Sequence, residues 1–164
     1  MFTFRCTRRL ITKLQAPIVT DPPEPTTSLG DWYGNVLFSG HHRFLMFVSE
    51  RSLLPVLMPL RERNRLLPNF RARLAELLLT LSIPEKDVTK ELSEMAEVVI
   101  ARTANRSLLG TMNDFTRNVK AYLQMHDDIS LLDLELRLAG TPCGPNVYRY
   151  PNELAIKILV GSDR

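Results

Sequence analysis

Hydrophobic and polar positions follow recognisable periods along the N-terminal part of the chain. Residues 2–7 alternate between apolar and polar side chains, which is typical of a half-buried strand, and Thr7 is well placed to cap a short basic helix over residues 8–14. Residues 16–27 contain four prolines, and proline lacks an N–H and restricts the residue before it. We therefore expect a strand, a short helix and then a stiff surface connection.

The segment after this connection carries a helix start signal. Ser28-Leu-Gly-Asp31 has the Ser-x-x-acid spacing of a capping box, and Trp32, Val36 and Leu37 follow it at helical offsets. Gly34 disfavours a helix interior, yet the spacing as a whole predicts a short helix here.

Two nearly continuous apolar runs, residues 43–49 and 52–58, are separated by the charged pair Glu50-Arg51. Continuous apolar character is typical of strands that are buried on both faces, and a short polar break is typical of a tight connection. Pro55 cannot donate a hydrogen bond to a neighbouring strand, so the second strand is expected at an edge of the sheet or at a bulge.

In the next part of the chain, apolar residues recur with a period near 3.6 residues, which is that of an α-helix. The clearest amphipathic helix starts at residue 66, and its apolar face is formed by Leu67, Phe70, Leu74, Leu77, Leu78 and Leu81. The capping box Ser82-Ile-Pro-Glu85 predicts a second helix, which runs to about residue 96 and exposes an acidic face.

The remaining residues alternate between strand and helix signals. The β-branched run at residues 98–101 predicts a strand, whereas helices are expected over residues 113–125, after Ser130 and from Pro151. Residues 161–164 are expected to fray. Together the elements predict a single α+β domain over residues 1–164, with a small, mostly antiparallel sheet of about four strands covered by several helices.

Composition narrows the class of protein without identifying it. The 164 residues include 21 basic and 18 acidic side chains, and the formal charge of +3 permits contact with nucleic acid but does not require it. The longest apolar stretches fall short of the roughly 20 residues of a membrane helix, and no signal peptide pattern follows the N-terminus. Cys6 and Cys143 have the spacing of neither metal ligands nor a disulfide framework. We therefore expect a cytoplasmic protein with no membrane partner, no bound metal and no cofactor.

The densest polar stretch, residues 102–114, lies between a predicted strand and a helical pattern that continues from Phe115. Unpaired backbone N–H groups at a helix start attract anions. Side chains that could complete an anion site are Arg102, Asn105, Arg106, Ser107 and Asn113. A purely structural interpretation is also open, in which Thr111 or Asn113 caps the helix and Gly110 supplies a left-handed turn.

Four segments, in this order, resemble a family of small uncharacterised bacterial proteins with a single domain of unknown function. The segments are Phe4-Arg-Cys-Thr-Arg-Arg-Leu10, Ser28-Leu-Gly-Asp-Trp-Tyr33, Phe47-Val-Ser-Glu-Arg-Ser-Leu-Leu54 and Arg102-Thr-Ala-Asn-Arg-Ser-Leu-Leu-Gly-Thr-Met-Asn-Asp114. The family pattern pairs an acid-Arg dipeptide between two strands with a later Asn-x-Ser-x-x-Gly-x-Met-Asn-Asp segment, which is matched here by Glu50, Arg51, Asn105, Ser107, Gly110, Met112, Asn113 and Asp114. The resemblance implies that these positions matter together, but it implies no substrate or reaction.

Other polar and aromatic groups allow both functional and structural interpretations. His41 and His42 could act as acid and base or as metal ligands, but neighbours in an extended segment point to opposite faces, so a shared metal is not expected. Trp32 and Tyr33 could stack on a nucleic-acid base or belong to the core. The arginines at positions 61–73 could form a phosphate track or a solvated helix face.

We favour the hypothesis that the protein is a binding module. In this hypothesis Arg51, Arg102 and Arg106 gather at the strand-to-helix junction and hold an anionic ligand or a protein partner, with nucleic acid as one such ligand. The Gly-x-Ser-x-Gly elbow and the glycine-rich phosphate loops are absent from the sequence, so serine hydrolysis and those kinds of nucleotide binding are not expected.

Two hypotheses of other classes remain open. One is an enzyme that acts on nucleic acid or another phosphate ester, with Glu50 or Asp114 as the acid–base group and an arginine that stabilises developing negative charge. The other is a structural or self-associating protein that uses an apolar helix at residues 154–159. The sequence does not define the oligomeric state.

Overall fold

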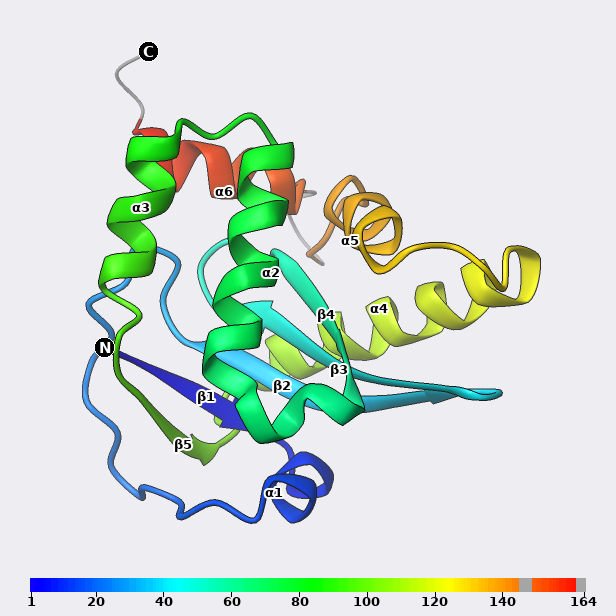
Figure 1. Cartoon of the computed structure of the whole chain (residues 1–164), viewed down its shortest axis with the longest axis horizontal. Coiled ribbons are helices and arrows are strands. Elements are labelled where there is room, and N and C mark those ends of the chain that lie inside the picture. The colour runs from blue at the N-terminus through cyan, green and yellow to red at the C-terminus, as the bar shows by residue number, and fades with distance from the viewer. Residues whose placement is uncertain (145–148, 162–164) are drawn as a thin grey trace.

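The computed structural model describes residues 1–144 and 149–161, and it contains a five-stranded mixed sheet with helices on both faces (Figure 1). The strands are β1 (Phe2–Cys6), β2 (Trp32–Ser39), β3 (His42–Ser49), β4 (Pro55–Pro59) and β5 (Val98–Arg102), in the spatial order β4-β3-β2-β1-β5. β1 is parallel to both β2 and β5, whereas β3 is antiparallel to β2 and β4. The α+β class is confirmed, but the sheet has one strand more than the approximate number expected, and half of its pairings are parallel.

The described helices occupy most of the predicted helical regions. They are α1 (Arg8–Leu14), the 3-10 helix η1 (Leu60–Arg65), α2 (Leu66–Thr80), α3 (Glu85–Ser93), α4 (Arg106–Met125), α5 (Leu131–Ala139) and α6 (Pro151–Val160). Thr7 caps α1 and Ser130 caps α5, as the sequence predicts. The capping box expected before α3 is not formed, because Ser82 adopts a positive φ of 64° and the N-cap residue is Pro84.

The prediction of a helix after Ser28-Leu-Gly-Asp31 is wrong, since this segment leads into β2. β2 lies between β1 and β3 and is covered on both faces, so Trp32 and Tyr33 are both buried although they point to opposite sides. A strand of this kind has no polar alternation that would distinguish it from a helix. Gly34 is required by close packing, because a Cβ atom built there would lie 2.5 Å from Phe47 Cε1.

Hydrophobic side chains form two clusters, one on each face of the sheet. The first joins β1, α1, α2 and α3, and its aromatic residues are Phe2, Phe4, Trp32, Phe47 and Phe70. The second lies between the other face and α4, whose buried residues are Leu108, Met112, Phe115, Val119 and Leu123. Figure 1 shows α2 in front of the sheet and α4 behind it. The sheet is therefore the middle layer of the fold.

Each outer strand forms a hydrogen bond at its free edge with a segment outside the sheet. The proline-rich connection forms no helix or strand, as expected, and Val19 N donates a hydrogen bond of 2.8 Å to Ile100 O of β5. On the opposite edge, β4 contains Pro55 as predicted, and Leu57 N donates to Glu135 Oε2 of α5 at 3.2 Å. These contacts occupy backbone groups that would otherwise be free to pair with another strand.

The C-terminal part agrees with the helices expected from the sequence. α6 begins with Pro151, and Gly161 follows its last residue. Of the four residues expected to fray, all but Gly161 lie outside the described residues. Within the described part of the chain, no helix is both long enough and apolar enough to span a bilayer.

Candidate functional site

Asp31 lies just before β2 and connects three parts of the sheet. Its Oδ1 accepts a hydrogen bond of 2.9 Å from Thr3 N, and its Oδ2 accepts one of 3.0 Å from Arg5 Nε. The Asp31 side chain is 2% exposed and that of Arg5 is 21% exposed, so the ion pair is largely removed from water. Glu50 binds the backbone of Asp31 twice, since Glu50 N donates to Asp31 O at 2.8 Å and Glu50 Oε2 accepts from Asp31 N at 3.3 Å. We call Thr3, Arg5, Asp31 and Glu50 the Asp31 cluster.

Tyr33 is the second residue of β2, and the charges of the Asp31 cluster act on its phenol. Burial raises the pKa of its phenol, the positive charge of Arg5 opposes this shift, and a hydrogen bond with the Ala104 backbone also lowers the pKa. Trp32 and Tyr33 are both buried, and Trp32 packs edge-on against Phe70 with ring centroids 5.0 Å apart. The two rings therefore belong to the core, and the interpretation as a stacking platform for bases is wrong.

Arg51 has a structural contact of its own, away from the predicted junction. Its Nη1 donates to Thr27 O at 3.2 Å and to Ser28 O at 3.3 Å, which fastens the β3–β4 turn to the segment before β2. Arg102 pairs with Cys6 at the carboxyl end of β1, whereas Arg51 lies beyond the amino end of β2. The predicted gathering of Arg51 with Arg102 is wrong, because the two residues lie toward opposite ends of β1.

The polar stretch 102–114 is mostly the exposed face of a helix. α4 begins at Arg106 instead of Asn113, and Asn105 is its N-cap, with Oδ1 accepting from Leu108 N at 3.1 Å. The structural interpretation, in which Thr111 or Asn113 caps the helix and Gly110 supplies a left-handed turn, is therefore wrong. All three residues lie inside the helix. The apolar period of α4 already begins before Phe115, but polar neighbours on the other face obscure it in the sequence.

Two arginines line a cavity at the carboxyl ends of β1 and β5. The cavity has a volume of about 230 Å³ and is lined by Cys6, Arg8, Ile11, Arg102 and Thr103; we call it the arginine pocket. Neither the Arg8 nor the Arg102 side chain forms a hydrogen bond or ion pair with another described residue. Burial raises the pKa of the Cys6 thiol to about 12, so this sulfur stays protonated and is not a nucleophile at neutral pH.

A second cavity, of about 430 Å³, lies between α4 and residues 141–144. Ser107 and Asp114 line it together with Cys143. Asp114 also pairs with Arg117 one turn along the helix, and burial together with the Asp114 charge raises the pKa of Cys143 to about 11. Asp114 lines this cavity on α4, whereas Glu50 lies in the Asp31 cluster at the β3–β4 turn. The two candidate acid–base groups therefore do not form one catalytic site.

His41 and His42 both face Asp127 at the tip of the β2–β3 hairpin. His42 Nε2 lies 2.9 Å from Asp127 Oδ1, His41 Nε2 lies 4.0 Å from Asp127 Oδ2, and the imidazole centroids are 4.1 Å apart. The hydrogen bond with His42 lowers the pKa of Asp127. The expectation that the two histidines point to opposite faces is wrong, because His41 lies in a two-residue turn after Gly40, which has a φ of 58°.

The basic residues between positions 61 and 73 mainly connect neighbouring elements. Arg73 pairs with Glu62 at 3.1 Å, and Arg71 Nη2 donates to Leu92 O at 3.2 Å. Arg63 donates to Leu60 O at 3.3 Å. These contacts favour the structural interpretation over a continuous phosphate track.

Sequence reasoning missed several residues that line these sites. The sequence does not identify Arg8 and Thr103 as neighbours, because the parallel pairing of β1 with β5, which brings them together, is not visible in a local pattern. The sequence pattern predicts Asp127 only as part of a helix start. Gly40-His41 between two apolar runs has the form of a two-residue hairpin turn, and this signal could have identified the hairpin tip.

Comparison with known proteins identifies a family for this chain but no activity. No curated protein and no solved structure matches this chain significantly. The family described as "Domain of unknown function (DUF6933)" matches residues 3–154, a range that includes the Asp31 cluster, the arginine pocket and the hairpin tip. Because this match covers most of the chain, the protein belongs to the DUF6933 family.

Proposed function

We propose that the protein is a binding module for a small anionic ligand, and that the ligand binds in the arginine pocket. The observation that supports this proposal most directly is the presence of Arg8 and Arg102 in one cavity of about 230 Å³, with no contact that neutralises either charge within the described residues. Both arginines are exposed, so an anion can reach them from solvent and would bring a negative charge to two positive ones.

The chemistry of the lining fits an oxyanion such as a phosphate or a carboxylate. A guanidinium group is planar and presents several N–H donors that match two oxygens at once. The Thr103 hydroxyl is a further hydrogen-bonding group in the pocket, and the first turn of α4 begins three residues later. Ligands of sheets with parallel strands commonly bind outside the carboxyl ends of those strands, which is where this pocket lies.

A binding role fits the pocket better than hydrolysis of a phosphate ester. The described lining contains no carboxylate and no histidine that could transfer a proton, and the Cys6 thiol is held in its protonated form. Arg106 is exposed at the start of α4 and would strengthen the attraction of an anion from solvent. Cys6 and Cys143 are free thiols, which supports our proposal that the protein works in a reducing compartment such as the cytoplasm.

The experiment is a titration of the untagged protein with inorganic phosphate, followed by amide chemical shifts. We expect the largest shifts at Thr103 and Ala104, and we expect R8A/R102A to weaken binding at least about tenfold, because each charged hydrogen bond contributes about 1.5–3 kcal/mol. R9A is the matched control, since Arg9 is the next residue on α1 but lies over the Phe38 ring, 5.5 Å from its centroid. Equal phosphate affinity of R8A/R102A and the wild-type protein would contradict the proposal.

Sulfate and a short single-stranded oligonucleotide complete the titration. Similar affinities for phosphate and sulfate are expected from a pocket that recognises charge and oxygen geometry. Much tighter binding of the oligonucleotide, lost in R8A/R102A and steeply weakened by salt, would instead assign the pocket to nucleic acid.

A further inference from the structure

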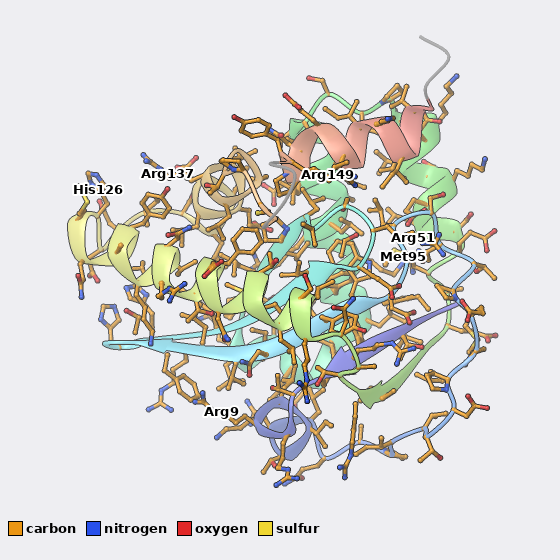
Figure 2. The ribbon with its side chains drawn as sticks, turned by 180° about the vertical axis from the view of Figure 1, so that it is seen from behind. Arg9, Arg51, Met95, His126, Arg137 and Arg149 are labelled. Atoms are coloured by element: carbon orange, nitrogen blue, oxygen red, sulfur yellow. The ribbon has the colours of Figure 1, made fainter. Side chains whose placement is uncertain are left out.

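The β2–β3 hairpin and the C-terminal end of α4 extend to the same side of the molecule (Figures 1 and 2). The hairpin closes through the pairing of Ser39 with His42, and the positive φ of Gly40 turns His41 toward the end of α4. α4 runs along β2 and β3 and ends at Met125, so Asp127 in the following connection reaches the hairpin tip. Three groups that commonly bind metals therefore converge from two separate segments.

Their geometry is close to that of a metal site. The three ligand atoms of His41, His42 and Asp127 all lie within 4.8 Å of one another. Around a tetrahedral zinc ion, with bonds of about 2.0–2.2 Å, ligand atoms are about 3.4 Å apart. The observed separations of 2.9 Å and 4.0 Å lie on either side of this value, so small side-chain rotations would be sufficient.

The burial of the three side chains fits a site that is preformed on one side and open on the other. His42 is 17% exposed and packs against the Phe44 ring, with centroids 5.4 Å apart, which restricts its orientation. His41 and Asp127 are 74% and 71% exposed, so an ion can reach them from solvent. The two oxygens of Asp127 each face one imidazole, Oδ1 that of His42 at 2.9 Å and Oδ2 that of His41 at 4.0 Å, so one carboxylate already lies between both rings.

We propose that His41, His42 and Asp127 bind a divalent transition-metal ion, with the ligand preference of zinc. Imidazole nitrogen and carboxylate oxygen are common zinc ligands, and three protein ligands leave a coordination position for water or an external ligand.

A basic cavity adjoins this metal site. The cavity has a volume of about 580 Å³, and its lining includes both histidines together with Arg43, Arg61 and Arg63. An oxyanion bound to the metal would meet these arginines in the same cavity. The external ligand of the metal is therefore an oxyanion such as phosphate, held by the metal and by the guanidinium groups.

The test of the metal site uses the untagged protein after treatment with a chelator. Cobalt(II) is titrated while its visible absorption is recorded, and zinc binding is measured by calorimetry. We expect one ion per chain and at least a tenfold loss of affinity in H41A, in H42A and in D127N, since each substitution removes one ligand atom.

H126A is the matched control for these variants. The chain has three histidines, and His126 is the neighbour of Asp127 that is not part of the three-ligand group. H126A is expected to bind cobalt and zinc like the wild-type protein, and circular dichroism verifies that every variant is folded. The proposal is overturned if zinc does not bind, if H42A and D127N bind it with unchanged affinity, or if H126A alone abolishes binding.

Phosphate tests the oxyanion part of the proposal. Addition of phosphate to the cobalt-loaded protein is expected to change the visible spectrum, and R61A/R63A is expected to require at least tenfold more phosphate for the same change. R65A is the control, because Arg65 lies on the same 3-10 helix but does not line the cavity. An unchanged spectrum, or an equal response in R61A/R63A, would overturn this part.

Discussion

Arg5 of β1 and Asp31 before β2 form an ion pair in which Arg5 Nε donates to Asp31 Oδ2 at 3.0 Å. The other carboxylate oxygen of Asp31 accepts from Thr3 N, and the Asp31 backbone is bound by Glu50. Asp31 thereby holds β1 through its buried side chain and the β3–β4 turn through its backbone. Residues that are far apart in the sequence therefore meet at one point of the sheet.

The substitution D31A is expected to lower the free energy of unfolding by about 2–4 kcal/mol, because it leaves the Arg5 guanidinium and Thr3 N without their acceptor. D31N keeps an oxygen for Thr3 N and should cost less. Urea unfolding measures both changes, and D128N, at an exposed neighbour of Asp127, is the control. A loss below about 0.5 kcal/mol in D31A, within the usual range of surface substitutions, would show that the pair does not hold the strands.

Gly34 and Gly110 should respond in opposite directions to the same added methyl group. A Cβ atom at Gly34 would lie 2.5 Å from Phe47 Cε1 and 2.8 Å from Leu10 Cδ2, so G34A is expected to destabilise the protein by about 1–3 kcal/mol. No atom lies within 4 Å of a Cβ at Gly110, which is inside α4, so G110A should stabilise it by about 0.5–1 kcal/mol. Thermal unfolding of the two variants checks both signs, and a stabilised G34A would contradict the packing of β2.

The true start of α4 can be tested at two asparagines. Asn105 Oδ1 accepts from Leu108 N, so N105A should lower the free energy of unfolding by about 0.5–2 kcal/mol, the usual cost of losing an N-cap. Asn113 is exposed in the middle of the helix, and N113A should leave stability unchanged or slightly raise it. Chemical denaturation measures the free energy of unfolding of both variants. A helix that started at Asn113 would instead make N113A the more destabilising of the two substitutions.

The sequence predicts those elements in which the pattern of apolar and polar residues matches the pattern of buried and exposed side chains in the structure. α2 shows this, because Phe70 and Leu74 lie on one buried face and the opposite face is polar. β4 shows it as well, since Pro55 excludes a central position in the sheet. β2 could not be recognised, because Trp32 and Tyr33 are buried in different layers and the alternation that marks a strand is lost.

The candidate sites were only partly predictable for a related reason. Local polarity identifies Arg102 as a candidate, but its proximity to Arg8 depends on the parallel pairing of two strands that are distant in the sequence. The same holds for Arg5 and Asp31, which are individually ordinary charged residues and gain their role only when β1 and β2 lie side by side. Polarity along the chain identifies candidates, whereas the pairing of strands decides which candidates meet.

Glu135 should make the stability of the protein depend on pH. Burial raises the pKa of this carboxyl group from 4.5 to about 8, although its hydrogen bond from Leu57 N opposes the shift. Between these two values the folded protein keeps the proton and the unfolded chain loses it. The free energy of unfolding should therefore decrease as pH rises from about 5 to about 8, by at most about 1.4 kcal/mol per pH unit. Above the folded pKa this contribution is lost.

The substitution E135Q isolates this effect, because the amide cannot titrate and its oxygen can still accept from Leu57 N. Urea unfolding at pH 5, 6, 7 and 8 should show that E135Q gains stability relative to the wild-type protein as pH rises. E153Q is the control, since Glu153 is exposed at the start of α6 and should leave the pH profile parallel to that of the wild type. If E135Q also gives a parallel profile, Glu135 does not titrate within this range, and the edge of β4 is held by a carboxylate that stays ionised in the folded protein.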